Sequence, residues 1–340
     1  MTVVAPAFVT VSPSYIEPNL ILPYTQASGF TDVLYGGDPQ IRLKPDDQYV
    51  FAKKLNIRQQ VTAAQQAANV LPGCDIVASQ ISTPTYLMRS RAEYDHHDTN
   101  AAGNWGISVP DAYRLGNRQG MNQQARNAAL YGFNPQNGEG ILNGAGITAV
   151  NLPPDTFGDT TASTYDAGQM AVFLLQQIAA LKTRMNQLGQ PLRITILGPQ
   201  RILSIFTYSG IVQLTSVQRP GGGSFTTMQV IAWILEENKD ELFWAYDDSL
   251  EGKGAGGNDA VLIVAPEIKK PTAPKFNTNI FADLSPALDA TVIQYADMAA
   301  PLEITVPLAA GATDTTYEQR ITSGWVLRGE AVTVVSMQYA

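Results

Sequence analysis

The sequence predicts an α+β fold arranged around one long helix, with strands before and after it in the chain. Three observations carry this prediction. Residues 107–131 have the pattern of a long helix that ends at a Gly/Asn/Pro turn, and residues 53–94 contain the period-two alternation of strands. Residues 151–305 alternate between helix and strand patterns, as a compact α/β unit does.

The long helix is expected to span residues 109–131. Pro110 suits the first helical turn, where a missing N–H costs nothing, and Gly132 can take the left-handed residue after the last turn. Inside the helix, Gly116 and Gly120 each cost roughly 1 kcal/mol relative to Ala. Two glycines one turn apart form a smooth groove, so we expect close packing against another element. An imperfect surface helix is the alternative.

The composition bounds the class of protein. The chain has 340 residues, of which 45% are hydrophobic and 15% charged, so it can bury a large core. A net charge of −8 argues against a general nucleic-acid binder, which would present a basic face. The single cysteine, Cys74, excludes an intrachain disulfide and fits a reducing compartment. No apolar run approaches a membrane span and no export signal is recognisable, so we expect a soluble protein.

The first 50 residues are expected to form an extended arm. Residues 1–40 are rich in apolar side chains, yet their prolines exclude a long helix and interrupt any central strand. Such an arm lies either on another subunit or on the body of its own subunit. Its apolar residues include Phe30, Val33 and Leu34, and its prolines are Pro6, Pro13, Pro18, Pro23 and Pro39.

A long β-hairpin is expected over residues 51–94. Its first limb alternates around Ile57, and its return limb places Tyr86 and Met88 on one face with charged residues on the other. A polar, alanine-rich connection lies between the limbs and ends in Leu71, Pro72 and Gly73. Isolated hairpins are marginally stable in water, so this hairpin needs another surface to lie on.

The α/β unit over residues 151–305 has a predictable order of elements. It begins with a strongly amphipathic helix, which Thr161 or Ser163 can cap. A short buried strand follows, then a helix after Pro199, a helix capped by Ser224, and two strands around a Gly-rich loop.

Alternating strands close the chain. The first spans residues 302–306, and a longer one over residues 317–328 places Tyr317, Ile321 and Trp325 on one face. The last is the apolar stretch AVTVV, at residues 331–335.

The residues after the long helix resemble a known family. The helix runs into a Gly/Asn/Pro turn, and a Gly-Ile-Leu-Asn segment then begins the next part of the chain. This arrangement resembles the major capsid proteins of tailed phages, which have the Hong Kong 97 fold. The sequence Glu318-Gln319-Arg320, near the start of the last long strand, is similar to the same family. The residues that match at the turn are Gly132, Gly138, Gly140, Ile141, Leu142 and Asn143.

The resemblance implies an α+β, Hong Kong 97-like capsid fold with four parts. In this family the hairpin, called the E-loop, reaches over the adjacent subunit, and the axial domains meet around the capsomer axis. The parts would be an N-terminal arm at residues 1–50, the E-loop at 51–94, a peripheral domain at 95–150 and 306–340 containing the spine helix 109–131, and an axial domain at 151–305.

The resemblance also implies a function. The chain would be a major capsid protein that self-assembles into pentamers and hexamers, forming the icosahedral head of a tailed bacteriophage around double-stranded DNA. Other expected partners are a portal protein and decoration or scaffolding proteins. DNA would be enclosed without sequence-specific binding. We expect a virion protein assembled in the host cytoplasm, with no membrane, no enzymatic activity, and no catalytic, cofactor or metal site. The expected assembly residues are Gly116, Gly120, Gly132, Gly140, Ile141, Leu142, Asn143, Ile57, Tyr86, Met88 and Trp325.

Other functions stay open at this point. An encapsulin-type nanocompartment shell has the same fold and would carry protein cargo. A soluble enzyme using the Gly-rich stretches at residues 219–227 or 252–259 is the outside alternative, although the second precedes a strand and offers no helix N-terminus to a phosphate. His96 and His97 lack the further ligands of a metal site, so we expect a solvated turn there.

Overall fold

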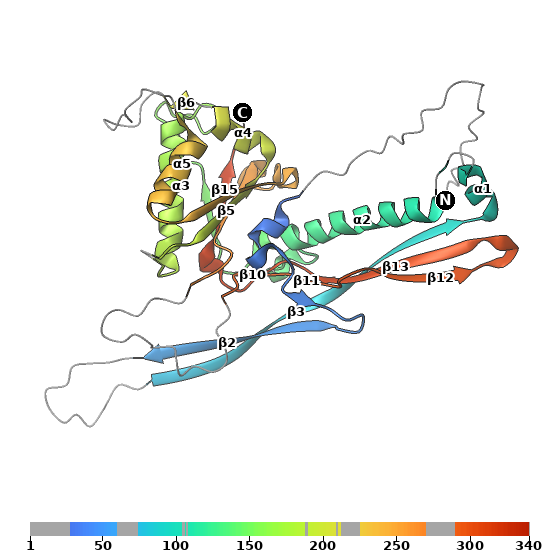
Figure 1. Cartoon of the computed structure of the whole chain (residues 1–340). Coiled ribbons are helices and arrows are strands. Elements are labelled where there is room, and N and C mark those ends of the chain that lie inside the picture. Colours follow the sequence, from blue (N-terminus) through green and yellow to red (C-terminus); the bar gives the residue numbers. More distant parts are fainter. Residues whose placement is uncertain are drawn as a thin grey trace, which may run out of the picture.

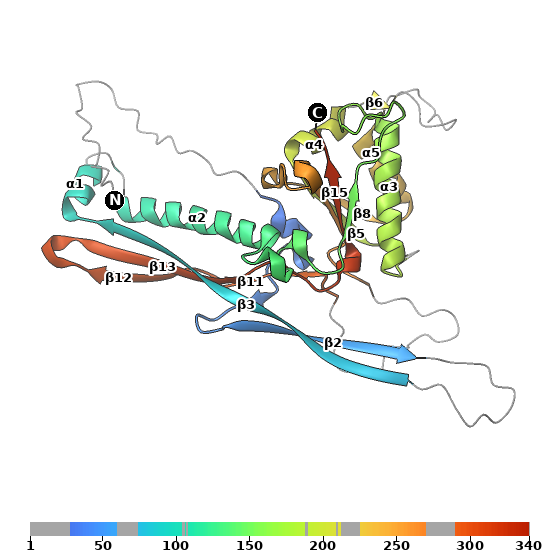
Figure 2. The ribbon, with the colours of Figure 1, turned by 180° about the vertical axis from the view of Figure 1, so that it is seen from behind.

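The computed structural model describes residues 28–59, 74–103, 106, 108–187, 190–208, 210–211, 225–269 and 290–339. Within these residues the chain has an elongated part and a rounder part, which meet near the end of the long helix α2 (Figure 1). In the elongated part α2 lies along a twisted sheet, and the hairpin formed by β2 and β3 extends beyond it (Figures 1 and 2). In the rounder part helices cover a five-stranded sheet.

The elongated part is built on a six-stranded sheet. Its strand order is β1-β11-β13-β3-β2, and β12 pairs with β13 outside this path. The long helix has the bounds that the sequence predicts. The strands are β1 (Ile41–Arg42), β2 (Tyr49–Gln59), β3 (Cys74–Tyr94), β11 (Ala296–Asp297), β12 (Leu302–Pro307) and β13 (Thr313–Thr322), and the helices are α1 (His96–Gly103) and α2 (Val109–Tyr131).

Strand β3 is long because two different strands pair with it. Its residues 74–84 pair antiparallel with residues 49–59 of β2, whereas its residues 85–94 pair antiparallel with β13. The expected limits of the hairpin are therefore wrong, because residues 85–94 belong to the sheet beneath α2. Strand β3 begins at Cys74, directly after Gly73, where the sequence predicts the connection to end.

The apolar face of the second half of β3 is covered by α2 of the same subunit. Ala92 of β3 is buried and packs with Met121 of α2, and Met88 lies against the same cluster. The ring of Tyr94 stacks on Tyr113 of α2, with 5.9 Å between their centroids. The predicted alternation is confirmed, but for this segment the covering surface is the subunit's own helix.

The rounder part is built on a sheet with the strand order β4-β15-β9-β5-β8. Strand β9 is antiparallel to both of its neighbours, and the outer strands β4 and β8 are parallel to theirs. Its elements are β4 (Thr148–Asn151), α3 (Ala167–Arg184), β5 (Arg193–Gly198), α4 (Gln200–Tyr208), α5 (Thr227–Glu237), β8 (Glu241–Tyr246), β9 (Asp259–Val264) and β15 (Val332–Met337). Two short strand pairs complete the described strands: β6 (Gly210–Ile211) with β7 (Phe225–Thr226), and β10 (Ile293–Gln294) with β14 (Trp325–Val326).

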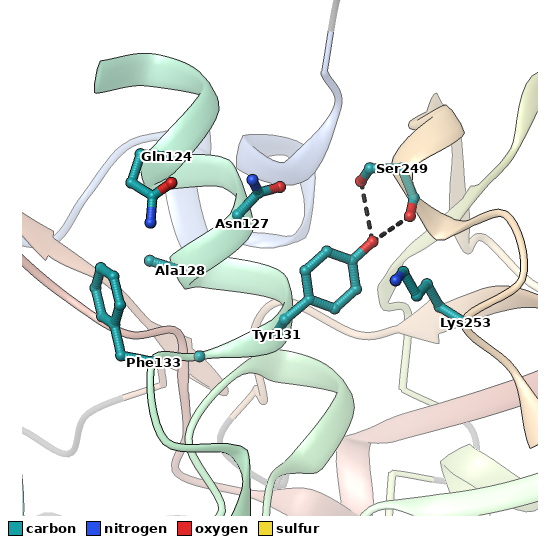
Figure 3. Close-up of a pocket in the computed structure, with 8 residues that line it drawn as sticks. Gln124, Asn127, Ala128, Tyr131, Phe133, Ser249 and Lys253 are labelled. Atoms are coloured by element: carbon teal, nitrogen blue, oxygen red, sulfur yellow. Dashed lines mark hydrogen bonds between the residues drawn. The ribbon is translucent and has the colours of Figure 1, made fainter. Parts of the chain in front are cut away.

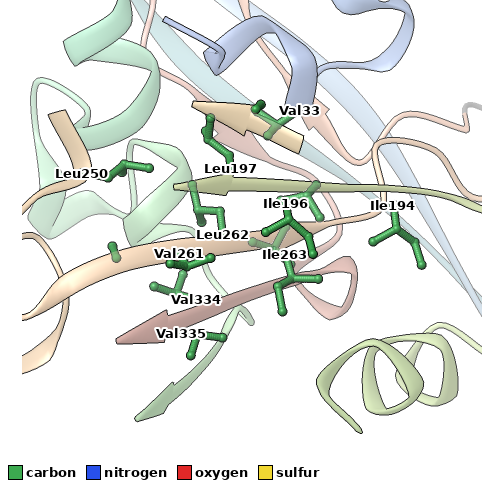
Figure 4. Close-up of a cluster of buried hydrophobic side chains, with 14 of the residues drawn as sticks. Val33, Ile194, Ile196, Leu197, Leu250, Val261, Leu262, Ile263, Val334 and Val335 are labelled. Carbon is green, nitrogen blue, oxygen red and sulfur yellow. The ribbon is translucent and has the colours of Figure 1, made fainter. Parts of the chain in front are cut away.

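The centre of this sheet is an aliphatic core (Figure 4). All six residues of β9 are buried, and Ile194, Ile196 and Val335 from neighbouring strands are fully buried beside it. A strand that is covered on both faces has a continuous apolar run in place of alternation, as β9 does. The order of helices and strands in this part is the predicted order.

Two helix starts differ from the predicted ones. Helix α3 begins after Asp166, not directly after Thr161 or Ser163, and no side-chain hydrogen bond caps it. Helix α5 is capped by Thr226, whose hydroxyl accepts a hydrogen bond from the backbone N–H of Gln229 in a capping box. The predicted cap, Ser224, lies outside the described residues.

Part of the expected N-terminal arm belongs to the core of its own subunit. Phe30, Val33 and Leu34 are buried in the main hydrophobic cluster. The turn that carries them is fixed to the sheet, because the hydroxyl of Thr195 in β5 donates a hydrogen bond to the carbonyl of Asp32. The alternative of packing on the subunit's own body is therefore correct for these residues, and residues 1–27 lie outside the described chain.

At the end of α2 two stretches of backbone cross in direct contact. A Cβ on Gly140 would lie 2.3 Å from the carbonyl carbon of Tyr131, and a Cβ on Gly132 would lie 2.5 Å from the carbonyl carbon of Glu139. Both glycines also have positive φ, 90° and 73° respectively. Only glycine satisfies both constraints, which explains the motif physically.

A third stretch of backbone joins this crossing through Gly324. Its N–H donates to the carbonyl of Ala128 at 3.0 Å, and its carbonyl accepts from the N–H of Gly140 at 2.7 Å. These bonds take the chain out of the sheet, so β13 ends at Thr322 and Trp325 lies in the separate strand β14. The predicted continuous strand over residues 317–328 is therefore wrong.

A buried carboxylate connects the same stretches. Glu139 is 8% exposed, and its carboxylate accepts hydrogen bonds from the Tyr86 hydroxyl at 2.9 and 3.0 Å and from the Ser323 hydroxyl at 2.8 Å. It also accepts from the backbone N–H of Asn134 at 3.2 Å. The Asn143 amide donates to the backbone carbonyl of Glu139 at 3.2 Å. Strand β3, the end of α2 and the end of β13 thus share one network.

The two glycines inside α2 are not packed against another element of the described subunit. A Cβ added to Gly116 or Gly120 would meet no atom within 4 Å, and both residues are exposed. The expectation of close packing is wrong within this subunit, since the buried face of α2 instead carries residues such as Met121 and Ala125.

We expect Gly120→Ala to raise the stability of the isolated subunit by up to about 1 kcal/mol, because it adds helix propensity and meets open space. Gly140→Ala is the matched comparison and should destabilise strongly, because its Cβ would overlap the backbone of Tyr131. Thermal unfolding followed by circular dichroism measures both changes. A lower melting temperature for Gly120→Ala would mean that the groove is filled within the subunit.

A second prediction concerns Tyr86. Burial, and then its hydrogen bond to Glu139, raises the pKa of this phenol above its ordinary value. The phenol of Tyr86 therefore loses its proton at a higher pH in the folded chain than in the unfolded chain. Its contribution to the free energy of unfolding is fully present below the pKa that Tyr86 has in the unfolded chain, and it is lost as the pH rises through the pKa of Tyr86 in the folded chain. Tyr86→Phe should therefore lose about 1.5–3 kcal/mol at neutral pH, the range for a hydrogen bond to a charged group, but should lose less further stability than the wild type at alkaline pH.

Urea unfolding across the alkaline range measures this difference, and Tyr113→Phe is the control because Tyr113 on α2 is 41% exposed and lies outside the Glu139 network. Parallel alkaline losses in Tyr86→Phe and the wild type would contradict the assigned role of Tyr86.

Candidate assembly surfaces

Several residues expected at assembly contacts lie inside the subunit. Ile141 is buried in the main core and Leu142 packs against it, while Asn143 donates its amide to the carbonyl of Tyr131 at 2.9 Å. Together with Gly132 they form the junction at the end of α2. These residues fix how the surfaces that remain exposed are positioned.

Trp325 anchors the base of the hairpin. It lies in a cluster with Leu43, Val50 of β2, Ala296 of β11 and Met298, which follows β11. The partly buried Ala52 and Ile81 of the hairpin pack against the same cluster. The near end of the hairpin is thus fixed to the sheet, so its direction is set by packing.

The two strands of the hairpin carry apolar side chains that the described chain leaves exposed. Tyr49 and Phe51 of β2 are 57% and 59% exposed, and Ile76 of β3 is 65% exposed. The strand register places these three residues on one face, and the rings of Tyr49 and Phe51 lie 6.2 Å apart. On the other face, Val77 is also exposed. Two strands cannot cover these groups by themselves.

The expected hairpin residue Ile57 belongs to the same pair of strands. Its backbone pairs with that of Ile76 in the antiparallel ladder. The side chain of Ile57 is outside the described part of the structure, and so are residues 60–73, which connect β2 to β3.

Strand β12 forms a second exposed apolar edge, which is not among the contact surfaces expected from the sequence. All six of its residues are exposed, and β13 is its only partner among the described strands. Leu302, Ile304 and Val306 share one face, whereas Glu303 points the other way and binds Arg114 of α2 with its carboxylate 3.0 Å from the guanidinium. An exposed edge with alternating aliphatic side chains favours pairing or packing with another chain. The alternation of aliphatic and polar residues in 302–306 is the sequence signal that could have identified this edge.

The cavity beside the end of α2 has no catalytic arrangement. It has a volume of about 330 Å³ and is open to solvent. The hydroxyl of Tyr131 is bonded to Ser249, and the Lys253 ammonium lies over the Tyr131 ring, 5.3 Å from its centroid (Figure 3). Gln124 and Asn127 supply neutral amides at its side (Figure 3). No nucleophile, general base and acid converge here among the described residues.

The histidine pair has a different local structure from the predicted one. His96 and His97 begin helix α1, and their rings lie 3.9 Å apart. In the described chain, no cluster of three or more His, Cys, Asp or Glu residues could hold a metal ion. No helix in the described ranges is long and apolar enough to cross a membrane.

The second Gly-rich stretch forms an internal contact. Arg201 of α4 binds the carboxylate of Asp259 at the start of β9, with its Nε 2.7 Å from one oxygen. The other Asp259 oxygen accepts from the N–H of Gly252 at 2.9 Å. This closes the loop on itself through a buried carboxylate.

Known proteins resemble this chain in structure but not in sequence. No protein-family profile matches the chain, and no curated protein sequence matches it. Solved structures do match. A chain from the capsid of Myoviridae phage XM1 superposes with a TM-score of 0.67 at 9% identity, covering 95% of this chain and 96% of the phage chain.

Two further structures agree with the first. A chain from the capsid of an empty GTA particle has a TM-score of 0.58 at 9% identity and covers 96% of this chain and 95% of its own. A chain of Mycobacterium phage Che8 has a TM-score of 0.53 at 11% identity, with 97% and 98% covered. Because the similarity extends over nearly the whole length of each partner, the chain has the fold of tailed-phage capsid proteins.

Proposed function

We propose that this chain is the major capsid protein of a tailed bacteriophage, assembling into pentamers and hexamers of an icosahedral head that encloses double-stranded DNA. The observation that carries the proposal is a firmly anchored hairpin with uncovered apolar faces, on a chain with a phage capsid fold. An isolated soluble domain gains nothing from such a projection. A shell subunit gains a contact with its neighbour.

In this proposal the shell is held together by several contacts between subunits, each of which contributes a modest binding free energy. The hairpin, the edge strand β12 and the rounder part each offer a separate exposed apolar surface. In a closed shell each surface would meet a different neighbour, and linked contacts reinforce one another because later ones form within the same assembly.

The parts of the chain take corresponding roles in this proposal. Residues 1–27 would continue the arm, and the β2–β3 hairpin would be the E-loop. The sheet with α2 would be the peripheral domain with its spine helix, and the five-stranded sheet with its helices the axial domain. A portal protein would occupy one vertex, and decoration or scaffolding proteins are further candidate partners. The acidic chain would enclose DNA without reading its sequence, as a non-enzymatic virion component assembled in the host cytoplasm.

A shortened hairpin tests the proposal. Replacing residues 55–78 by Asn-Gly joins Lys54 to Ser79, which are paired in the ladder, through a favoured two-residue turn. Val50, Ala52 and Ile81 keep their packing around Trp325. We expect a melting temperature near that of the wild type, together with loss of shells in electron micrographs.

Point variants of β2 provide the control. Phe51→Ser removes an exposed side chain and should weaken assembly without changing the melting temperature, whereas Val50→Ala removes buried volume and should lower it. Normal shells from the shortened chain would show that the hairpin is dispensable for assembly. An unfolded shortened chain would place the hairpin within the subunit's own stability.

A further inference from the structure

A single phenylalanine is presented to solvent by the loop between β4 and α3. Phe157 is 92% exposed, more than any other large hydrophobic residue in the described chain. Full exposure of a phenyl ring forgoes the free energy gained by burying it, which is roughly 1.5–3 kcal/mol for a large apolar side chain. Phenylalanine is one of the aromatic residues enriched at the cores of protein interfaces, so Phe157 is a candidate for contact with another molecule.

The loop holds this side chain in place before any partner arrives. The Asp155 carboxylate accepts hydrogen bonds from the backbone N–H groups of Phe157 and Asp159, both at 2.8 Å. The N–H of Asp155 donates to the carbonyl of Asp159 at 2.7 Å, and the side chain of Thr156 is bonded to Gln169 of α3. Because the loop is already ordered, docking would cost little conformational entropy.

The loop also carries a negative charge that the described chain does not use. The carboxylate of Asp159 forms no ion pair with any residue of the described ranges. Phe157 and Asp159 therefore present an apolar ring beside a free carboxylate.

The opposite edge of the same sheet carries the complementary pair. Phe243 of the outer strand β8 is 43% exposed, and the guanidinium of Arg193 lies 4.0 Å from the centre of its ring. Arg193 has no carboxylate partner in the described part of the chain, and its buried Nε has no hydrogen-bond acceptor there. An aromatic ring and an unpaired cation thus lie side by side.

The sheet topology makes these two surfaces suitable for a ring. Strands β4 and β8 are the two outer strands of the five-stranded sheet. The Phe157 loop leaves the β4 edge at Leu152, which bonds to Ser336, and returns to that edge at Thr161, which pairs with Gln338, so the two surfaces belong to opposite edges of the sheet. A contact between two different surfaces of identical subunits runs head to tail, and it closes into a ring when the rotation between subunits allows. Two copies of the same surface would instead give a dimer.

We propose that Phe157 and Asp159 of one copy dock on Phe243 and Arg193 of the next copy, forming the repeated contact of a pentameric or hexameric ring. The partner is a second copy of this chain, because the two surfaces carry opposite charges, Asp159 and Arg193, each beside an exposed aromatic ring. The inference rests on the proposed function for the ring and specifies which residues close it.

Disulfide trapping tests the contact directly. In a Cys74→Ser background, the pair Phe157→Cys with Phe243→Cys should give on oxidation a ladder of species that ends at a closed pentamer or hexamer. The matched control is Phe157→Cys with Tyr113→Cys. Tyr113 lies on α2 and is 41% exposed, compared with 43% for Phe243, and this pair should give no ladder. Phe157→Cys alone should give no dimer.

Charge reversal is the second measurement. Asp159→Arg and Arg193→Asp should each reduce the yield of capsomers, and the double variant should restore it. Circular dichroism on each variant separates this loss from misfolding, and if Arg193→Asp does not fold, the trapping experiment still decides.

Normal shells without a ladder would reject this contact and leave the proposed function standing. A dimer from Phe157→Cys alone would replace the head-to-tail contact by a symmetric one. A monomer that neither assembles nor crosslinks would reject both the contact and the proposed function.

Discussion

The crossing of backbones at the end of α2 is the constraint on which the rest of the structure depends. Gly132 and Gly140 allow two stretches to touch, and Gly324 brings in a third through hydrogen bonds to Ala128 and Gly140. Any side chain at these positions would separate the stretches. The long helix, the sheet beneath it and the rounder part are therefore held in a fixed arrangement by the absence of side chains.

The buried carboxylate of Glu139 makes the same junction specific. Its partners come from β3, from the turn after α2 and from the end of β13, so no one of these elements can shift without leaving a buried donor or acceptor unpaired. The hairpin continues directly from β3 and is clamped at its base by the cluster around Trp325. The junction at the end of α2 thus fixes the direction of the β2–β3 hairpin, whose apolar faces are uncovered in the described chain.

The sequence predicts local features of this fold well. Helix α2 has its expected bounds because a proline, a run of helix formers and a closing glycine all act within the segment itself. The core strand β9 is recognisable from its continuous apolar run. The glycine motif also marks a real junction, although the pattern gives no indication that Gly324, far along the chain, completes it.

Features that depend on distant partners were missed. Alternation shows that a strand has a covered face but does not say what covers it. The pattern of residues 85–94 therefore fits a hairpin limb as well as it fits a strand beneath α2, which is what the structure shows. Gly116 and Gly120 suggested packing, yet a glycine pattern is the same whether a neighbouring element fills the space or solvent does. The Phe157 loop carries no such pattern, so its exposure becomes visible only when the surrounding surface is known.

We propose that the subunit is stable alone, and that its exposed apolar surfaces are covered only when neighbouring subunits close the shell. Light scattering on the purified protein across a range of concentrations, with electron microscopy of the same samples, measures this most directly. We expect masses of pentamers, hexamers or shells, and closed particles in the images. A monodisperse monomer at every concentration would contradict the claim.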